Sequence, residues 1–166
     1  IKTMPVENLA GPVRAELEKT GLWSDRYETG QKEWFLSILD LIRERFHVIT
    51  DFATLGRPWF SDDYPMEAKA LEKNLMAHPE MKTLLPELAG KIDELDPYTA
   101  QTVETALREM LKASGIKPGV LINAVRTALT GQAKGPDFIQ TLFVLGKETV
   151  VQRLTRAARL FPVDSP

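Results

Sequence analysis

The fold is decided by the stretch Lys117-Pro-Gly-Val-Leu-Ile-Asn-Ala-Val-Arg-Thr-Ala-Leu-Thr-Gly131, which a polar break, Gln-Ala-Lys, separates from Gly135-Pro-Asp-Phe-Ile-Gln-Thr-Leu-Phe143. Apolar residues recur in both parts at helical spacing, so both are predicted to be amphipathic helices. The first stripe consists of Val120, Leu121, Ala124, Val125, Ala128 and Leu129, and the second of Phe138, Ile139, Leu142, Phe143 and Leu145. Gly131 suits the left-handed residue that ends a helix, and Pro136 suits the first turn of the next one. The stretch therefore predicts two helices joined by a tight connector.

This connector is a candidate site for binding a nucleobase. The first backbone N–H groups of the second helix, near Asp137, have no partner within that helix. Arg126 lies on the preceding helix, one turn before Thr130, and Phe138 brings an aromatic ring to the same area. A planar guanidinium, amide donors and a ring are groups that hold an unstacked base by its edge and its face. The same spacing also fits a structural interpretation, in which Arg126 caps a neighbouring helix and Phe138 belongs to the core.

The rest of the chain also has helical periodicity, and no segment alternates apolar and polar residues as a strand would. Further helices are predicted over Glu7–Lys19, Gln31–Arg45, Thr50–Leu55, Met66–Met76, Glu80–Glu94, Asp96–Ser114 and from Gly146 to Phe161, before a tail from Pro162 to Pro166. Pro12 moves the expected start of the first helix to near Gly11. Asp96-Pro97 supplies a cap and a first-turn proline for the helix that ends at Ser114. The last helix is expected to present Arg153, Arg156 and Arg159 outward.

These helices predict an all-α fold, a compact helical cage of two small helix-bundle subdomains. The aromatic segment Trp59–Tyr64 contains Asp62 and Asp63 and is followed by Pro65, and these three residues break regular structure and mark the boundary. The predicted subdomains are residues 1–62 and 63–166. The chain begins at Ile1 rather than at a methionine, which indicates a fragment of a longer protein.

Composition excludes several classes of protein. There is no cysteine, and His47 and His78 have no second ligand at helical spacing, so no metal site is expected. No glycine-rich phosphate loop or nucleophile motif occurs, so no catalytic residue is predicted. No apolar run reaches the length of a membrane span and no signal peptide is visible, which favours a cytoplasmic protein.

The net charge of −2 conceals an uneven distribution. Residues 1–100 contain 12 Lys and Arg against 18 Asp and Glu, whereas residues 101–166 contain 9 against 5. The positive excess therefore falls in the part of the chain that contains the connector, as binding to a phosphate backbone requires. Arg43 and Arg45, in the acidic part, end a predicted helix and are expected to interact with its dipole rather than with RNA.

The amino-acid sequence of the connector and its flanks resembles the C-terminal anticodon-binding region of bacterial-type glutamyl-tRNA synthetases, which are class I enzymes. The resemblance rests on Leu-Ile-Asn-Ala-Val-Arg-Thr-Ala-Leu-Thr-Gly (121–131), Gly135-Pro136, Leu145-Gly146-Lys147-Glu148 and Arg153-Leu154. Two upstream pieces agree with it, Arg43-Glu44-Arg45-Phe46 and Phe60-Ser61-Asp62-Asp63-Tyr64-Pro65. The resemblance covers nearly the whole chain, in the family's order.

The resemblance implies recognition of the second and third anticodon bases of tRNA(Glu). Arg126, Gly135, Pro136 and Phe138 match the positions that lie at those bases in the family, and Arg126 is the expected main specificity residue. The phosphate backbone is assigned to Lys134, Lys147 and Arg153. Two departures are notable, because the family often has a hydroxyl residue in place of Gly135 and a glycine in place of Asp137. The family's arginine for the first anticodon base lies upstream of Ile1, so that specificity is outside the chain.

The same resemblance places catalysis elsewhere. A class I synthetase activates glutamate with ATP and Mg²⁺ in a domain that carries His-Ile-Gly-His-type and Lys-Met-Ser-Lys-Ser-type motifs, and neither occurs here. The parent would be an ATP-dependent aminoacyl-tRNA ligase, whereas this chain, without cofactors of its own, would be inactive. The expected partner is tRNA(Glu), with tRNA(Gln) left open, and the expected state is a monomer that contacts neither DNA nor membrane.

Three other interpretations fit parts of the pattern. A helical protein-interaction module would have the same composition and mixed surface charge. The C-terminal cage of a class I lysyl-tRNA synthetase is also helical, although Thr-Ala-Leu-Thr-Gly favours glutamate. A helix-turn-helix DNA-binding protein is disfavoured, because the second helix of the pair is too apolar to be a recognition helix.

Overall fold

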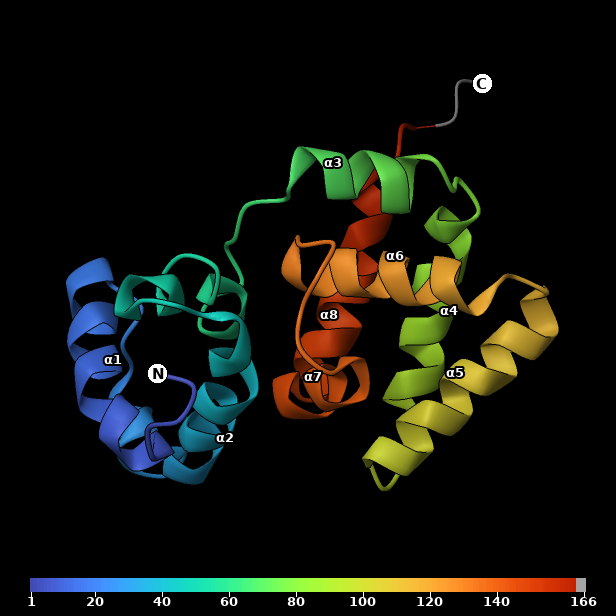
Figure 1. Cartoon of the computed structure of the whole chain (residues 1–166). Helices are drawn as coiled ribbons and strands as arrows, with labels where there is room; N and C mark the ends of the chain where they lie inside the picture. The colour runs from blue at the N-terminus through green and yellow to red at the C-terminus, as the bar shows by residue number, and fades with distance from the viewer. Residues whose placement is uncertain (164–166) are drawn as a thin grey trace. The chain divides into compact units, whose positions relative to one another are not determined.

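The computed structural model describes residues 1–163, and these residues form eight α-helices and no strand (Figure 1). The all-α prediction is therefore confirmed for the described part of the chain. Contacts divide the chain into two units, Ile1–Tyr64 with Gly135–Asp137, and Pro65–Lys134 with Phe138–Pro166. The end of the tail, residues 164–166, lies outside the described residues.

The first unit is built on α1 (Val6–Thr20) and α2 (Lys32–Ile42). Short 3₁₀ turns connect and follow them, at Asp25–Tyr27, Arg43–Arg45, Ile49–Phe52 and Arg57–Trp59. The apolar stripes of both helices are buried, at Leu9, Val13 and Leu17 in α1 and at Phe35, Ile38, Leu39 and Ile42 in α2. Aromatic rings complete this core, since Phe46 and Phe52 meet edge to face at 4.9 Å between ring centroids.

The second unit contains the other six helices. These are α3 (Ala68–Ala70), which continues into a π-helical turn over Leu71–Met76, α4 (Met81–Asp93), α5 (Ala100–Ser114), α6 (Pro118–Thr130), α7 (Phe138–Leu145) and α8 (Lys147–Ala157). The most extensive packing is between α4 and α8, which lie side by side in Figure 1. Leu85, Leu88 and Ile92 of α4 are fully buried there with Val150 and Leu154 of α8.

Three predicted helix starts are wrong. Pro12 lies inside α1, which begins at Val6, so the helix continues through the proline although Pro12 cannot donate a hydrogen bond to the Asn8 carbonyl. The helix ending at Ser114 is capped by Thr99 rather than by Asp96, because the Thr99 hydroxyl accepts from the Thr102 N–H at 3.1 Å.

The third wrong start concerns Pro136. The helix α7 begins at Phe138, so Pro136 precedes it instead of forming its first turn. Gly135–Asp137 belong by their contacts to the first unit, whereas α6 and α7 belong to the second. The connector is therefore longer than the sequence pattern indicated.

Candidate nucleic-acid interface

The helix α6 carries the candidate site, and its sequence explains both of its ends. Pro118 occupies the first turn, where its missing N–H costs nothing. Gly131 follows the last turn with φ of 74°, and its N–H donates to the Thr127 carbonyl at 2.8 Å. The predicted stop at Gly131 is therefore confirmed.

A second constraint makes glycine necessary at this position. A Cβ at residue 131 would lie 2.2 Å from the backbone oxygen of Pro65. The Gly131 carbonyl also accepts a hydrogen bond from the Glu67 N–H at 2.8 Å. The end of α6 is thus held against the segment that leads into α3.

Arg126 and Phe138 lie together in the second unit, as the sequence indicated. The guanidinium carbon of Arg126 is 5.7 Å from the centroid of the Phe138 ring, within the range of a cation–π contact. Both side chains are half-buried, so neither is a fully enclosed core residue. The contact orients a planar array of N–H donors beside a partly exposed aromatic ring, which is the pair of groups needed to bind a base.

Gly135 and Pro136 have a different environment. Both are half-buried and belong to the first unit, where the Gly135 carbonyl accepts from Nη1 of Arg45 at 3.5 Å. The sequence pattern did not predict this contact of Arg45, whose side chain was expected to interact with a helix dipole. Arg43 does have a structural role, because it pairs with Asp40 at 2.7 Å and donates to the Met4 carbonyl.

The three cations assigned to phosphate differ in exposure. Lys134 is exposed on the connector. Lys147 is half-buried, and its Nζ donates to the Leu95 carbonyl at 3.1 Å. It also shares a cleft of about 520 Å³ with two carboxylates, Asp93 and Glu148.

Arg153 is not a surface residue, so its predicted outward orientation is wrong. Only 3% of it is exposed, and its Nη1 donates to the Leu129 carbonyl at 2.7 Å. The last carbonyls of a helix lack partners within the helix and carry the negative end of its dipole. Arg153 therefore caps α6 from α8, and a phosphate cannot reach it without displacing this contact.

Charge is distributed unequally between the two units. The first contains 8 Lys and Arg against 12 Asp and Glu, and the second contains 13 against 11. The second unit, which contains Arg126, Lys134 and Phe138, is therefore the one whose charge suits a polyanion.

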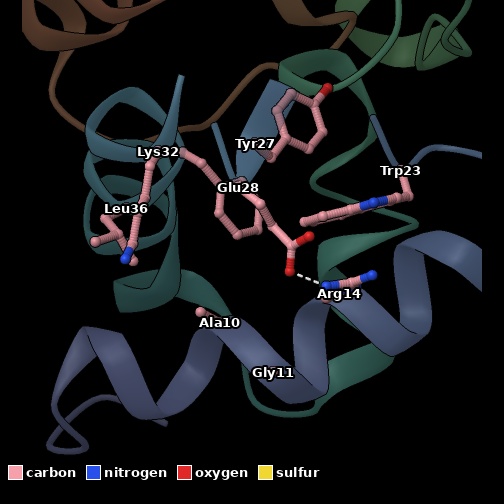
Figure 2. Close-up of a pocket in the computed structure, with 9 residues that line it drawn as sticks. Ala10, Gly11, Arg14, Trp23, Tyr27, Glu28, Lys32 and Leu36 are labelled. Atoms are coloured by element: carbon pink, nitrogen blue, oxygen red, sulfur yellow. Dashed lines mark ion pairs between the residues drawn. The ribbon is translucent and has the colours of Figure 1, made fainter. Parts of the chain in front are cut away.

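The first unit has a cleft of its own, about 470 Å³ in volume, between α1 and α2 (Figure 2). Arg14 lies over the Trp23 ring at 4.9 Å from its centroid and forms ion pairs with Glu18 and Glu28. Figure 2 shows the Glu28 carboxylate directed at Arg14. The arginine in this cleft is therefore neutralised by carboxylates of its own chain, and an anionic ligand would have to compete with them.

Neither a metal site nor a membrane span occurs among the described residues. Within residues 1–163, no group of three or more His, Cys, Asp or Glu side chains could hold a metal ion. No helix in this range combines the length and the apolar character that crossing a membrane requires. Burial raises the pKa of Tyr98, whose hydroxyl donates to the Leu142 carbonyl, so Tyr98 is a structural hydrogen-bond donor that stays protonated.

Known proteins similar to this chain are anticodon-binding domains and glutamate–tRNA ligases. Residues 9–158 match the family model described as an anticodon binding domain. The chain is 42% identical over 161 residues to the glutamate–tRNA ligase of Desulfotalea psychrophila, covering 97% of this chain and 33% of that protein. It is 32% identical over 160 residues to glutamate–tRNA ligase 2 of Koribacter versatilis, covering 96% of this chain and 32% of that protein.

A solved structure is similar over the same extent. The crystal structure of a glutamate–tRNA ligase from Elizabethkingia meningosepticum, in complex with its amino acid, matches with a TM-score of 0.77 and 25% identity. The match covers 94% of this chain and 29% of that one. The chain thus spans about a third of the length of the relatives it matches.

Proposed function

The chain belongs to the anticodon-binding domain family, and from this premise we propose that it recognises the anticodon of tRNA(Glu) as part of a glutamate–tRNA ligase. The observation that carries the proposal is the contact between Arg126 and Phe138, 5.7 Å from guanidinium carbon to ring centroid, on the edge of a connector that also presents Lys134. Arg126 supplies directional N–H donors, Phe138 supplies a stacking face, and Lys134 supplies a positive charge for the phosphate backbone. An RNA loop with unstacked bases requires all three.

We assign separate roles to these residues. Arg126 donates to the edge of an anticodon base and Phe138 packs against a base face. Gly135 and Pro136, which precede Phe138 in the chain, contact an anticodon base. Lys134 contacts phosphate, and Lys147 does so with the N–H donors that its bond to Leu95 leaves over. Arg153 is withdrawn from this set, because it is buried and caps α6.

The wider assignments extend the proposal to the whole protein. The whole protein would ligate glutamate to tRNA(Glu) with ATP and Mg²⁺, as a cytoplasmic monomer, with its catalytic residues outside this chain. Residues 1–62 and 63–166 would be its two anticodon-binding subdomains. Whether tRNA(Gln) is also accepted depends on how strongly the third anticodon base is discriminated.

The test is equilibrium binding of the chain to tRNA(Glu) and to versions of it with the second or third anticodon base replaced. We expect each replacement to weaken binding about tenfold to a hundredfold, since one good base contact contributes about 1–3 kcal/mol. Affinity for all versions should fall together as salt is raised. Equal affinity for all versions would refute anticodon recognition, and salt-independent binding would refute the assigned phosphate contacts.

A further inference from the structure

The hydroxyl of Thr130, in the last turn of α6, joins the helix to the connector. Thr130 is 2% exposed. Its Oγ1 donates to the Arg126 carbonyl at 2.9 Å and accepts from the Gln132 N–H at 3.2 Å. One buried oxygen thus links the residue proposed to read the base with the first connector residue after Gly131.

The neighbouring residues are held from other elements, so this link is part of a fixed corner. The Leu129 carbonyl accepts a hydrogen bond from Nη1 of Arg153 in α8 at 2.7 Å, and the Gly131 carbonyl accepts one from the Glu67 N–H at 2.8 Å. Because Gly131 also lies close to the Pro65 carbonyl, the chain has little room to move on that side. Two hydrogen bonds restrict the direction in which the chain leaves Gly131: the Gln132 N–H donates to Thr130, and the Ala133 N–H donates to the Glu67 carboxylate at 3.5 Å.

From this arrangement we infer that Thr130 is a positioning residue for anticodon specificity. It touches no base itself, and the inference rests on the proposed function of Arg126. A directional contact to a base edge is productive only when donor and base are aligned within about half an ångström. The Thr130 hydroxyl sets the spacing between the Arg126 backbone and the connector, and hence where the guanidinium lies relative to a base held by Phe138.

The chain contains a matched control one turn earlier on the same helix. Thr127 is fully buried, and its Oγ1 accepts from Nδ2 of Asn74 at 3.1 Å. Its hydroxyl has no hydrogen bond to the connector among those described. Removing either hydroxyl should therefore cost similar stability, while only Thr130 should affect the connector.

The experiment compares Thr130→Val, Thr130→Ser and Thr127→Val in the full chain. Valine keeps the shape of threonine without the hydroxyl, and serine keeps the hydroxyl without the methyl group. The measured quantity is the ratio of affinities for tRNA(Glu) and for the version with its second or third anticodon base replaced. Thermal unfolding of each variant reports the structural cost separately.

We expect Thr130→Val to reduce the ratio about threefold to tenfold, the equivalent of one hydrogen bond, while its salt dependence stays that of the wild type. Thr130→Ser should restore the ratio, and Thr127→Val should leave it unchanged despite a similar loss of thermal stability. A wild-type ratio in Thr130→Val, or an equal reduction in Thr127→Val, overturns the inference alone. A wild-type chain that does not discriminate between the tRNAs overturns the proposed function, and the inference with it.

Discussion

Replacing Arg126 with alanine removes the guanidinium that lies over Phe138, and its consequences separate base recognition from general attraction to RNA. The side chain is half-buried on α6, and the helix around it is held by buried neighbours on both sides. Folding should therefore survive the change. What is lost is a directional donor pair and one positive charge.

The two losses have different magnitudes and different signatures. Loss of a bidentate base contact costs about 1–3 kcal/mol, so discrimination between tRNA(Glu) and an anticodon variant should fall roughly tenfold to a hundredfold. Loss of one charge should weaken binding to every tRNA and reduce the slope of log affinity against log salt by about one. Arg126→Lys should keep the slope and still lose most of the discrimination, because an ammonium lacks the planar fork.

The control is Arg108→Ala on α5. This residue also belongs to the second unit, but its side chain is 75% exposed and pairs with Glu104 at 2.8 Å. The substitution Arg108→Ala removes one positive charge, as Arg126→Ala does, and leaves the connector unchanged. The assay is equilibrium binding at two salt concentrations, with circular dichroism to check folding. If Arg126→Ala keeps wild-type discrimination, or Arg108→Ala loses as much of it, the assignment of Arg126 is refuted.

Three further predictions concern the same corner. Arg153→Met should lower the free energy of unfolding by about 1.5–3 kcal/mol, as expected for loss of a charged hydrogen bond to Leu129, with no change in the salt dependence of tRNA binding; a changed salt slope would restore its phosphate role. Gly131→Ala should lower the free energy of unfolding in urea by at least about 1 kcal/mol. Gly90→Ala within α4, where a Cβ meets nothing, should raise it by about 0.5–1 kcal/mol, and equal effects of the two substitutions would refute the close approach at Gly131. Lys134→Ala should weaken all tRNAs alike and lower the salt slope by about one, and a base-selective effect would contradict that role.

Much of the second unit follows from local sequence signals. The stripe on α6 and the glycine that ends it specify the helix and its stop, because helical periodicity and a left-handed cap are properties of a few neighbouring residues. The proximity of Arg126 and Phe138 also follows, since both lie within one turn of an end of their helix. Only one of the two reasons for glycine at position 131 could be predicted from the sequence. Its positive φ can be inferred from the sequence, but the approach of the Pro65 carbonyl joins residues far apart in the chain.

The connector itself shows where local signals fail. Pro136 has the sequence context of a first helical turn, yet Gly135–Asp137 make their contacts in the first unit and α7 starts at Phe138. Which unit a short segment packs against depends on groups such as Arg45, and nothing in the local pattern identifies them. Thr130 was passed over for a related reason, because a threonine in a last helical turn usually bonds to the carbonyl one turn back. Its second bond, to Gln132, depends on the path of the chain after Gly131.

The misplacement of Arg153 has a different cause, because the sequence did contain the signal. Val150 and Ala157 stand three residues before and four residues after it, and both are buried. Residues at these spacings share a helix face, so the periodicity places Arg153 on the apolar side of α8. Its charge was taken as evidence of exposure, although a buried guanidinium needs only an acceptor that is itself short of donors. The end of a packed neighbouring helix provides such acceptors, and Leu129 of α6 is one. An arginine on the buried face of a helix is therefore better interpreted as a cap for an adjoining helix, and here that cap holds the corner from which Arg126 extends.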